Sequence, residues 1–473
     1  MAFVKLSDLT IQYQSYDSKV AWPPTIDHLS ATFESGTLTL LTGPSGSGKS
    51  TLLKTIAGLY PKFGEASVSG SVTIETSSTQ PRVAMMFQDP NQQFAMDTVE
   101  RELRFALENL QVEADKIDDQ VQAALDYVGI SNLRHRQLNN LSGGEKQKVA
   151  LAIIVAMDSE VILLDEPFAS IDPAARQTLL IKLRQLNQEA HKTVIIADHD
   201  LLNYEPYVDG LVRLSDDGHQ LRFFDRDAAH DVFEAFKNSA QLDISVTLPQ
   251  PNEPTAVTLN QTSLIAGDRT LLKPTSFTFP EHRVILLTGI NGSGKSTLLR
   301  AITNLSNYIG DITVAGVSTS RFHKNQRYQQ VGLVFQEADD QFLNVTVAEE
   351  LALSLKHSRH PEYFQARLDD DLNNLGLADL REHVVYSLSG GQKKKLQILI
   401  MLIMATPILL LDEPFTGLDL QSLNTVVALV KDVQQAFKLT LIMISHQLQG
   451  LAPLIDYHAV LANQTLTYVE AIR

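Results

Sequence analysis

The chain contains no cysteine and a single tryptophan among its 473 residues. Without cysteine it can form neither a disulfide nor a thiolate metal site, which fits a reducing cytosolic compartment. Long apolar runs are missing too. The most apolar stretch, Leu396 to Leu411, is interrupted by Gln397, Thr406 and Pro407 and is shorter than the roughly 20 residues of a spanning helix. It predicts a buried helix, a turn at Pro407 and a buried strand, so we expect any membrane role to depend on a partner.

Positive charge is scarce as well. The formal net charge is −16, which argues against a protein that wraps nucleic acid, because phosphate backbones are bound mainly by lysine and arginine. The first residues, Met1 to Leu6, lack the charged and apolar regions of a signal peptide. The length exceeds that of one ordinary domain and suits two.

What the sequence does contain is the phosphate-binding pattern G-x-x-x-x-G-K-[ST], once at 43–50 and again at 289–296. Each copy follows an apolar run and precedes a helix-prone run, which predicts a strand, a loop and a helix. Glycines let backbone N–H groups point at a phosphate, while the helix N-terminus and the lysine add positive charge. The expected nucleotide ligands are Gly43, Ser45, Gly46, Gly48, Lys49, Ser50 and Thr51, and then Gly289, Asn291, Gly292, Gly294, Lys295, Ser296 and Thr297. Ser50 and Ser296 are also expected to bind Mg²⁺.

The phosphate-binding pattern is one sign that the whole chain is a duplication. Five landmarks recur at offsets of 246 to 248 residues: Gly43 and Gly289, Gln88 and Gln336, Leu141 and Leu388, Asp165 and Asp412, and His199 and His446. Such a long period indicates two copies of a domain rather than a solenoid. The proline-rich polar stretch 248–255 suits an extended linker, so we predict domains at 1–247 and 256–473.

Each half alternates apolar runs with helical patterns. This predicts an α/β fold with a mainly parallel sheet covered by helices. Residues 99–128 and 347–375 show helical spacing without strand runs. We therefore expect an inserted helical subdomain in each half.

In both halves an apolar run ends in paired acids, Asp165-Glu166 and Asp412-Glu413. A buried strand would carry both carboxylates to the sheet edge where phosphates bind. The first acid would hold Mg²⁺ through water, and the second could polarise the water that attacks the γ-phosphate. Leu-Ser-Gly-Gly begins 24 residues before each aspartate, and its serine and glycine N–H groups at a helix start can form a second anion cradle.

Together, and in this order, these motifs resemble those of the ATP-binding-cassette (ABC) ATPases, whose signature is LSGGE or LSGGQ. The resemblance implies two P-loop NTPase domains, each with a mainly parallel sheet, an antiparallel β part and an inserted helical subdomain. It also implies that the two domains pair head to tail within one chain, so that ATP lies between one phosphate loop and the signature of the other domain. The further ATP ligands implied are Gln88, Ser142, Gly143, Gly144 and Glu145, and Gln336, Ser389, Gly390, Gly391 and Gln392.

The same resemblance assigns roles around the γ-phosphate. Mg²⁺ is expected on Ser50, Gln88 and Asp165 in one site and on Ser296, Gln336 and Asp412 in the other. The catalytic residues implied are the bases Glu166 and Glu413 and the γ-phosphate-sensing histidines His199 and His446. Asp172 and Asp419 match the family's loop that contacts the opposite site.

The two halves differ where the family stacks adenine on an aromatic side chain. Tyr13 fits that place in the first half, with Tyr16 as an alternative. The second half has Ala266 there, between Ile265 and Gly267. Because stacking on a base contributes roughly 1–3 kcal/mol, we expect the second site to hold ATP more weakly or to stack it on another group. All its catalytic groups remain, so both sites are expected to hydrolyse ATP.

The segments after Gln88 and Gln336 both repeat Gln-Phe, Thr-Val and Glu-Leu. They are similar to the ATPases of cobalt-type and energy-coupling-factor importers, here fused into one chain. This similarity implies a peripheral protein on the cytoplasmic face of the cell membrane, bound to a transmembrane coupling protein and a substrate-binding membrane subunit. Phe94 and Phe342 could either pack the helical subdomain or contact that partner. The sequence does not reveal which vitamin, vitamin precursor or transition metal is imported.

Two alternatives stay open. One is the tandem ATPase of a sugar importer, although the second half of such proteins often has degraded motifs. The other is a soluble ABC ATPase of translation or DNA repair, although these usually carry a long charged linker or cysteines for zinc or iron–sulfur clusters.

Overall fold

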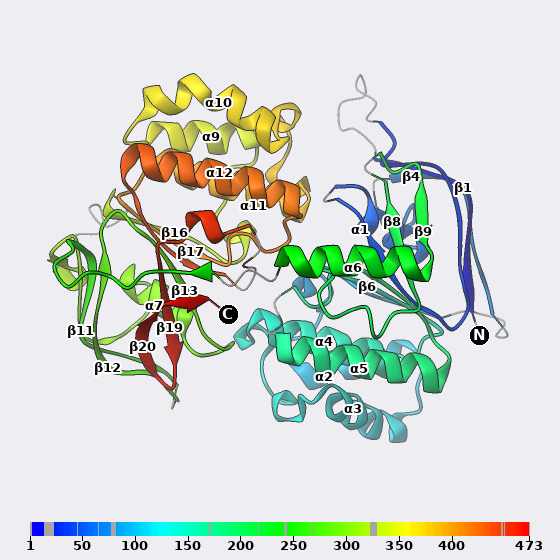
Figure 1. Cartoon of the computed structure of the whole chain (residues 1–473). Helices are drawn as coiled ribbons and strands as arrows, with labels where there is room; N and C mark the ends of the chain where they lie inside the picture. The colour runs from blue at the N-terminus through cyan, green and yellow to red at the C-terminus, as the bar shows by residue number, and fades with distance from the viewer. Residues whose placement is uncertain are drawn as a thin grey trace. The chain divides into compact units, whose positions relative to one another are not determined.

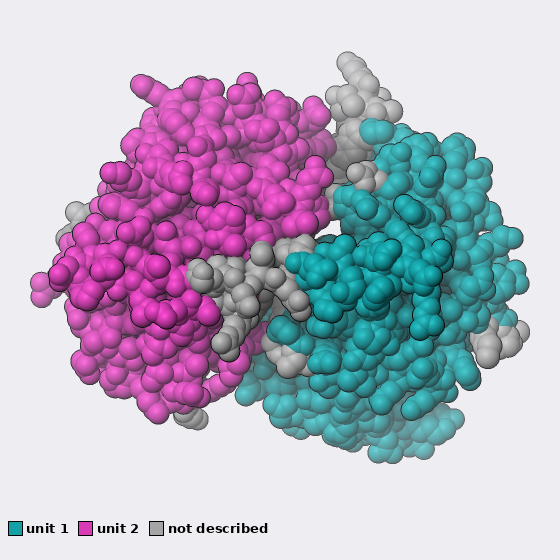
Figure 2. Space-filling view, in the orientation of Figure 1, with its two compact units in different colours: residues 1–238 teal, residues 239–473 magenta. Residues whose placement is uncertain are grey.

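The computed structural model describes residues 2–13, 23–44, 46–64, 66–76, 82–169, 171, 173–215, 217–240, 244–267, 269–321, 329–445, 448 and 450–472. The chain divides into two compact units, residues 1–238 and 239–473 (Figure 2). Strand β10 (Ile244–Ser245) pairs with β21 (Ala471–Ile472) near the end of the chain. Residues just before the predicted linker at 248–255 are therefore part of the second unit.

Unit 1 contains two sheets (Figure 1). The antiparallel sheet has the order β2-β1-β4, with β1 at Phe3–Tyr13, β2 at Ile26–Phe33 and β4 at Ala66–Glu75. The central sheet has the order β5-β6-β7-β3-β8-β9, and only β9 runs antiparallel to its neighbour. Its strands are β3 (Leu38–Thr42), β5 (Val83–Met86), β6 (Val161–Asp165), β7 (Thr193–Ala197), β8 (Gly210–Leu214) and β9 (Leu221–Phe224).

Among the described residues, the α-helices packed with these sheets are α1 (Lys49–Ile56), α2 (Val99–Asn109), α3 (Ala114–Val128), α4 (Gly143–Ala156), α5 (Pro173–Ala190) and α6 (Arg226–Ala240). The central strands are apolar on both faces because both are covered. Ile162 and Leu164 pack in the core with α2 to α5, whereas Val161 and Leu163 pack with α1 and the antiparallel sheet. This alternation is the two-residue period of a strand.

Unit 2 repeats the plan. Its antiparallel sheet has the order β12-β11-β14-β15, and its central sheet has the order β16-β17-β18-β13-β19-β20. The strands are β11 (Thr255–Ala266), β12 (Arg269–Pro280), β13 (Val284–Thr288), β14 (Ile309–Val314), β15 (Val317–Ser318), β16 (Val331–Val334), β17 (Ile408–Asp412), β18 (Thr440–Ile444), β19 (Tyr457–Ala462) and β20 (Thr465–Val469). The helices are α7 (Lys295–Ile302), α9 (Val347–Lys356), α10 (Pro361–Leu375), α11 (Gly390–Met404) and α12 (Leu420–Phe437).

The predicted α/β class is confirmed, and so are its parts. The helical insertions expected at 99–128 and 347–375 form α2 with α3 and α9 with α10. The apolar stretch Leu396 to Leu411 is a buried helix followed by a buried strand, with Pro407 between them. Among the residues that the structure describes, no helix combines the length and apolar character needed to cross a bilayer.

Candidate active sites

A glycine loop joins a central strand to a helix in both units. Gly48 directly precedes α1 with φ 99°, and Gly294 precedes α7 with φ 106°. A Cβ at Gly48 would lie 3.0 Å from the side chain of Ile26, and one at Gly294 would lie 2.8 Å from Leu271. Both the left-handed backbone and the close packing therefore require glycine. The other predicted ligands here, Gly43, Gly46, Gly289, Asn291, Gly292 and Thr297, lie in these loops or in the first turn of α7, and Ser45 lies outside the described residues.

The lysine of each loop points back into the loop. Lys49 Nζ donates to the carbonyl oxygens of Gly43, at 2.7 Å, and Pro44, at 2.9 Å. Lys295 Nζ makes the equivalent bonds to Gly289, at 2.7 Å, and Ile290, at 3.3 Å. Each ammonium group is thus held inside a ring of backbone at a helix N-terminus, where an anion is favoured.

The serine after each lysine contacts the first of the paired acids. Ser296 Oγ donates to Asp412 Oδ1 at 3.0 Å, and Ser50 hydrogen-bonds to Asp165. Burial raises the pKa of Asp165 to about 7, and the neighbouring Glu166 adds to this shift. Burial likewise raises the pKa of Asp412 to about 6, against the opposing effect of the Ser296 hydrogen bond. A cation at either carboxylate would favour its charged form.

The second acid has an unusual backbone in both units. Glu166 has φ 46° and Glu413 has φ 49°, in the left-handed region that residues other than glycine rarely adopt. The amide of Glu166 donates to Ala197 at 2.8 Å, and that of Glu413 donates to Ile444 at 3.1 Å. Both acceptors end the neighbouring strand. Strained backbone of this kind concentrates at functional sites.

In unit 1 the fold brings four predicted site residues together from separate elements. Gln88 Nε2 donates to Glu166 Oε2 at 2.9 Å, and His199 Nδ1 lies 3.4 Å from Glu166 Oε1. Burial opposes the charge on Glu166, but His199, Lys49 and Gln88 outweigh it and lower its pKa. Burial also opposes charge on His199, yet Glu166 and the nearby aspartates raise its pKa to about 9. Glu166 and His199 therefore form a charged pair beside Asp165.

The corresponding cluster of unit 2 includes a residue that the sequence did not single out. Lys394 on α11 donates through Nζ to the backbone oxygen of Gln336 and to that of Glu413, the latter at 3.4 Å. Burial lowers the pKa of Lys394 to about 8. The first half has Gln147 in this register, so a comparison of the halves could have found it. His446 lies outside the described residues.

Both signature motifs begin a helix. Ser142 caps α4 and Ser389 caps α11, and in each case the side chain three residues on, Glu145 or Gln392, bonds back to the serine. The signature glycines, Gly143, Gly144, Gly390 and Gly391, form the first helical positions. The serine and its helix N-terminus thus have the geometry of an anion cradle.

The loop after the paired acids is described in full only in unit 2. Asp419 caps α12, where Oδ1 accepts from the Ser422 amide at 2.8 Å. Asp172, in the same register of unit 1, lies outside the described residues.

The positions expected to stack on adenine differ between the two units. Tyr13 forms a 2.8 Å hydrogen bond between its hydroxyl and Thr51 Oγ1, and its ring meets Tyr60 edge-on at 5.9 Å. In unit 2, Ala266 pairs directly with Arg269 where β11 turns into β12. A Cβ at Gly292 would lie 3.8 Å from Nη1 of Arg269. The sequence did not single out Arg269 at the phosphate loop, although the short turn containing Gly267 was a visible signal.

The segments after Gln88 and Gln336 are held by their own repeated residues. Gln93 accepts from the Phe87 amide at 3.4 Å, and Gln341 accepts from the Phe335 amide at 3.2 Å. The buried Glu102 accepts from the amides of Ala95, at 2.9 Å, and Met96, at 2.7 Å. Glu350 does the same for residues 343 and 344.

The two phenylalanines of these segments have different surroundings. Phe342 is buried among the helices of unit 2, whereas Phe94 is half-buried against the core of unit 1. The neighbouring Leu343 is 81% exposed. Packing therefore accounts for Phe342, and Leu343 is available at the surface.

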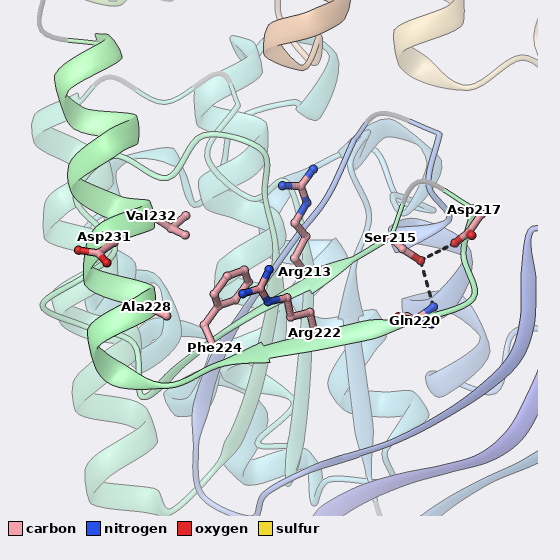
Figure 3. Close-up of a pocket in the computed structure, with 9 residues that line it drawn as sticks. All are labelled: Arg213, Ser215, Asp217, Gln220, Arg222, Phe224, Ala228, Asp231 and Val232. Carbon is pink, nitrogen blue, oxygen red and sulfur yellow. Dashed lines mark hydrogen bonds between the residues drawn. The ribbon is translucent and has the colours of Figure 1, made fainter.

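A pocket of about 730 Å³ lies elsewhere in unit 1, between the β8–β9 hairpin and α6 (Figure 3). Arg213 and Arg222 face each other across the two strands, and the Arg222 guanidinium lies 4.8 Å from the centre of the Phe224 ring. Asp217 and Asp231 also line it. The pocket includes none of the predicted site residues.

Comparisons with known proteins show which families, sequences and structures the chain is similar to. A family profile described as ABC transporter matches residues 26–169 and 272–416. YkoD of Bacillus subtilis, provisionally named an HMP/thiamine import ATP-binding protein, is 29% identical over 97% of this chain and 91% of its own length. A protein of Streptococcus mutans, provisionally named an ABC transporter ATP-binding protein, is 29% identical over 94% of this chain and 87% of its own length.

Solved structures share the fold at lower identity. ABCE1 in a model of ribosome-bound archaeal Pelota and ABCE1 aligns with a TM-score of 0.69, 18% identity and coverage of 98% of this chain and 78% of that one. The ribosome recycling factor aABCE1, in complex with the stalk protein aP1, aligns with a TM-score of 0.59 and 20% identity over 95% of this chain and 87% of that one.

Proposed function

The chain belongs to the ABC transporter family, as a tandem ATPase with two ATP-binding cassettes, and from this premise we propose that it drives an importer of the energy-coupling-factor type. The observation that carries the proposal is the similarity to YkoD along 97% of the chain, which takes in both cassettes. The cargo class that this supports is a vitamin or vitamin precursor. The chain would be peripheral, held at the cytoplasmic face of the membrane by its partners.

Within each cassette, the chemistry proposed is phosphate cradling followed by water activation. The loop amides and Lys49 or Lys295 would hold the β- and γ-phosphates. Glu166 and Glu413 would polarise the attacking water, and His199 and His446 would contact the γ-phosphate. The charged state of Glu166 beside His199 supports its assignment as a base, since a base must be able to accept a proton.

Mg²⁺ is the second cofactor proposed. The Ser50–Asp165 and Ser296–Asp412 contacts offer hydroxyl and carboxylate oxygens beside the phosphate loop, the donor type that Mg²⁺ takes together with water and phosphate oxygens. Among the described residues no cluster of three or more acidic or histidine side chains could hold a metal alone. This fits an ion that is shared with a nucleotide. Bound there, the ion would neutralise charge on the transferred phosphoryl group.

We further propose that the two cassettes pair head to tail and share their sites. Ser389 and Gly391 would complete the site of Lys49, and Ser142 and Gly144 would complete the site of Lys295. The capping geometry of both serines supports this role, because each leaves a helix N-terminus and glycine amides at the motif.

A surface for the membrane partner is proposed in unit 2. Leu343, Val345, Val384 and Tyr386 are exposed by 81%, 60%, 38% and 56%. The Val385 amide donates to the Val345 carbonyl at 2.8 Å, so these two segments lie side by side. We name these four residues the unit 2 apolar patch. At the corresponding positions, unit 1 has Ala95, Asp97, Gln137 and Asn139, which are exposed and mostly polar. An apolar partner helix would therefore dock on unit 2 more tightly than on unit 1.

The proposal is tested by purifying the tagged chain from membranes of its native host and identifying what is retained. We expect an integral membrane subunit, and we expect Leu343→Glu with Val345→Glu to release it while the variant stays folded. Leu305→Glu provides a matched control, because Leu305 is 59% exposed but lies outside the patch. Retention of ribosomes, together with ATPase activity that ribosomes stimulate, would refute the transport function.

A further inference from the structure

Behind His199 lies a buried polar cluster to which the roles above assign nothing. It consists of Arg176 on α5, Asp198 directly after β7, and Tyr204 in the segment that follows. We call it the Arg176 cluster. All three residues are buried, and Tyr204 has no measurable exposure. Buried charges are costly unless they are paired, so their presence beside a catalytic residue requires a reason.

The Arg176 cluster includes Asp198, on one side of His199, and binds Asp200, on the other side. Tyr204 donates to Asp198 Oδ2 at 2.6 Å, and Arg176 Nη2 lies 3.6 Å from the same oxygen. Arg176 also donates to the backbone oxygen of Asp200 at 2.7 Å and forms an ion pair with its carboxylate. The guanidinium lies 4.9 Å from the centre of the Tyr204 ring, a cation–π contact.

These bonds hold His199 in place. Its Nδ1 lies 3.4 Å from Glu166 and 3.7 Å from Asp198. Because Asp198 and Asp200 are both bonded to Arg176, the chain on either side of His199 is held, which restrains movement of the imidazole away from Glu166. Arg176 lies in the first turn of α5, which begins at Pro173. A movement of this helix start would therefore pass directly to His199.

Unit 2 has different chemistry at the same positions. In the 247-residue register the cluster corresponds to Leu423, Ser445 and Leu451. The two leucines are buried, and an aliphatic side chain cannot form a hydrogen bond or an ion pair.

The structure supports this register. Helices α5 and α12 both have 18 residues. Asp209 and Asp456, also 247 residues apart, accept equivalent backbone bonds from Leu38, at 2.8 Å, and Val284, at 2.7 Å.

We propose that Arg176, Asp198 and Tyr204 are positioning residues that lock His199 onto Glu166 and couple it to the start of α5, so that the two ATP sites differ in their hydrolysis step. The proposal rests on the catalytic role proposed for His199. In this proposal, the first ATP site is held more rigidly than the second. The second site has none of these three side chains at the corresponding positions.

The test replaces the cluster by its own counterpart from unit 2, as the triple variant Arg176→Leu, Asp198→Ser and Tyr204→Leu in the full chain. Changing all three avoids a buried Asp198 without its cation, which Arg176→Leu alone would leave. Tyr204→Phe is a milder second variant that keeps the ring and removes one hydrogen bond. Arg184→Leu is the matched control, because Arg184 lies on the same helix and pairs with Asp209 at 2.6 Å, away from His199.

Two measurements are made on each variant. Hydrogen exchange of peptides covering 198–204 is expected to accelerate about tenfold or more in the triple variant and less in Tyr204→Phe, because local opening becomes easier. Steady-state ATPase assays are expected to show kcat reduced about tenfold with KM changed less than about twofold, the pattern of an interaction needed in the hydrolysis step. Arg184→Leu should leave both unchanged.

The outcomes separate the two proposals. Unchanged exchange at 198–204 in the triple variant would overturn the positioning role, and so would a raised KM with unchanged kcat. Exchange accelerated equally throughout unit 1 would also overturn it, since that indicates only lost stability. If the wild-type chain hydrolysed no ATP, the proposed function would fail, while the exchange experiment would still decide whether the cluster holds His199.

Discussion

At the residue scale, Glu166 combines a local strain with long-range contacts. Its left-handed backbone follows from its place after β6, but its side chain is oriented by Gln88 and His199, which belong to distant segments. A strained residue that is held by several partners is pre-organised rather than mobile. The same backbone recurs at Glu413, so the turn is common to both sites.

Replacing this glutamate by glutamine is the first prediction. Glu166→Gln with Glu413→Gln removes both proposed bases while keeping side-chain size, so turnover should fall about 10²–10⁴-fold, the usual contribution of general-base catalysis. ATP affinity should change little. Single-turnover ATPase assays and equilibrium nucleotide binding measure the two effects. Glu234→Gln, at an exposed ion pair with Lys237 on α6, is the control, and rapid turnover in the double variant would refute the assignment.

The His199–Glu166 pair predicts a pH dependence of the nucleotide-free chain. Because the folded protein raises the pKa of His199 from 6.5 to about 9, the protonated imidazole stabilises the fold. The contribution to the free energy of unfolding totals on the order of 1–3 kcal/mol. It is fully present below about pH 6.5 and is lost as the pH rises through about 9.

The measurement is the difference in unfolding free energy between wild type and His199→Gln from pH 6.5 to 9.5. We expect this difference to shrink as the pH rises. A difference that stays constant over this range would contradict the prediction.

At the scale of elements, local pattern was sufficient for most of the fold. The strands that end in paired acids, the helices that follow the glycine loops and the helix–turn–strand at Leu396 to Leu411 all formed as predicted. Their signals are short-range: apolar runs, glycine at positive φ and a proline that ends a helix. The sequence could not predict the role of the β11–β12 hairpin, because that role depends on which loop the hairpin packs against.

We propose that Arg269, on that hairpin, takes the place of Tyr13 in the second site. Arg269→Ala should lower the ATP affinity of the second site about three- to tenfold, because a guanidinium beside the phosphate loop can pair with phosphate or stack on the base. Binding to the first site should not change. Titration with a fluorescent ATP analogue in a Lys49→Ala background, which disables the first loop, measures the second site, and the same titration in a Lys295→Ala background measures the first. Lys273→Ala, an exposed cation on the same strand, is the control, and equal losses in both variants would indicate only a general charge effect.

At the scale of the whole molecule, each unit has its own central sheet and its own apolar core. Most contacts that stabilise a unit are therefore internal to it. The strand β10 matters for where the chain can be divided, because it pairs with β21 at the far end of unit 2.

Division after Asn238 should give two fragments that fold, whereas neither should hydrolyse ATP alone if each site needs the other's signature. Circular dichroism and ATPase assays measure the two properties, and mixing the fragments should restore part of the activity. Division at residue 248 is the comparison. It removes β10 from the second fragment and should lower its melting temperature by a few degrees, since about 1 kcal/mol shifts a domain of this size by roughly 2–4 °C. Full activity of one fragment would refute shared sites.

The sequence by itself determined the duplication, the α/β class and the chemistry at the strand ends. The duplication was visible because whole motifs repeat along the chain. The α/β class and the strand-end chemistry depend on residues that are adjacent or a few positions apart, so their geometry follows from local backbone preference and hydrophobic period. Tertiary structure alone decided that Arg176 reaches across to Asp198 and Tyr204, that Lys394 bonds beside Glu413 and that Arg269 lies at the second phosphate loop. These contacts join residues that are distant in the chain, and their existence depends on how helices pack on the sheet, which no local pattern specifies.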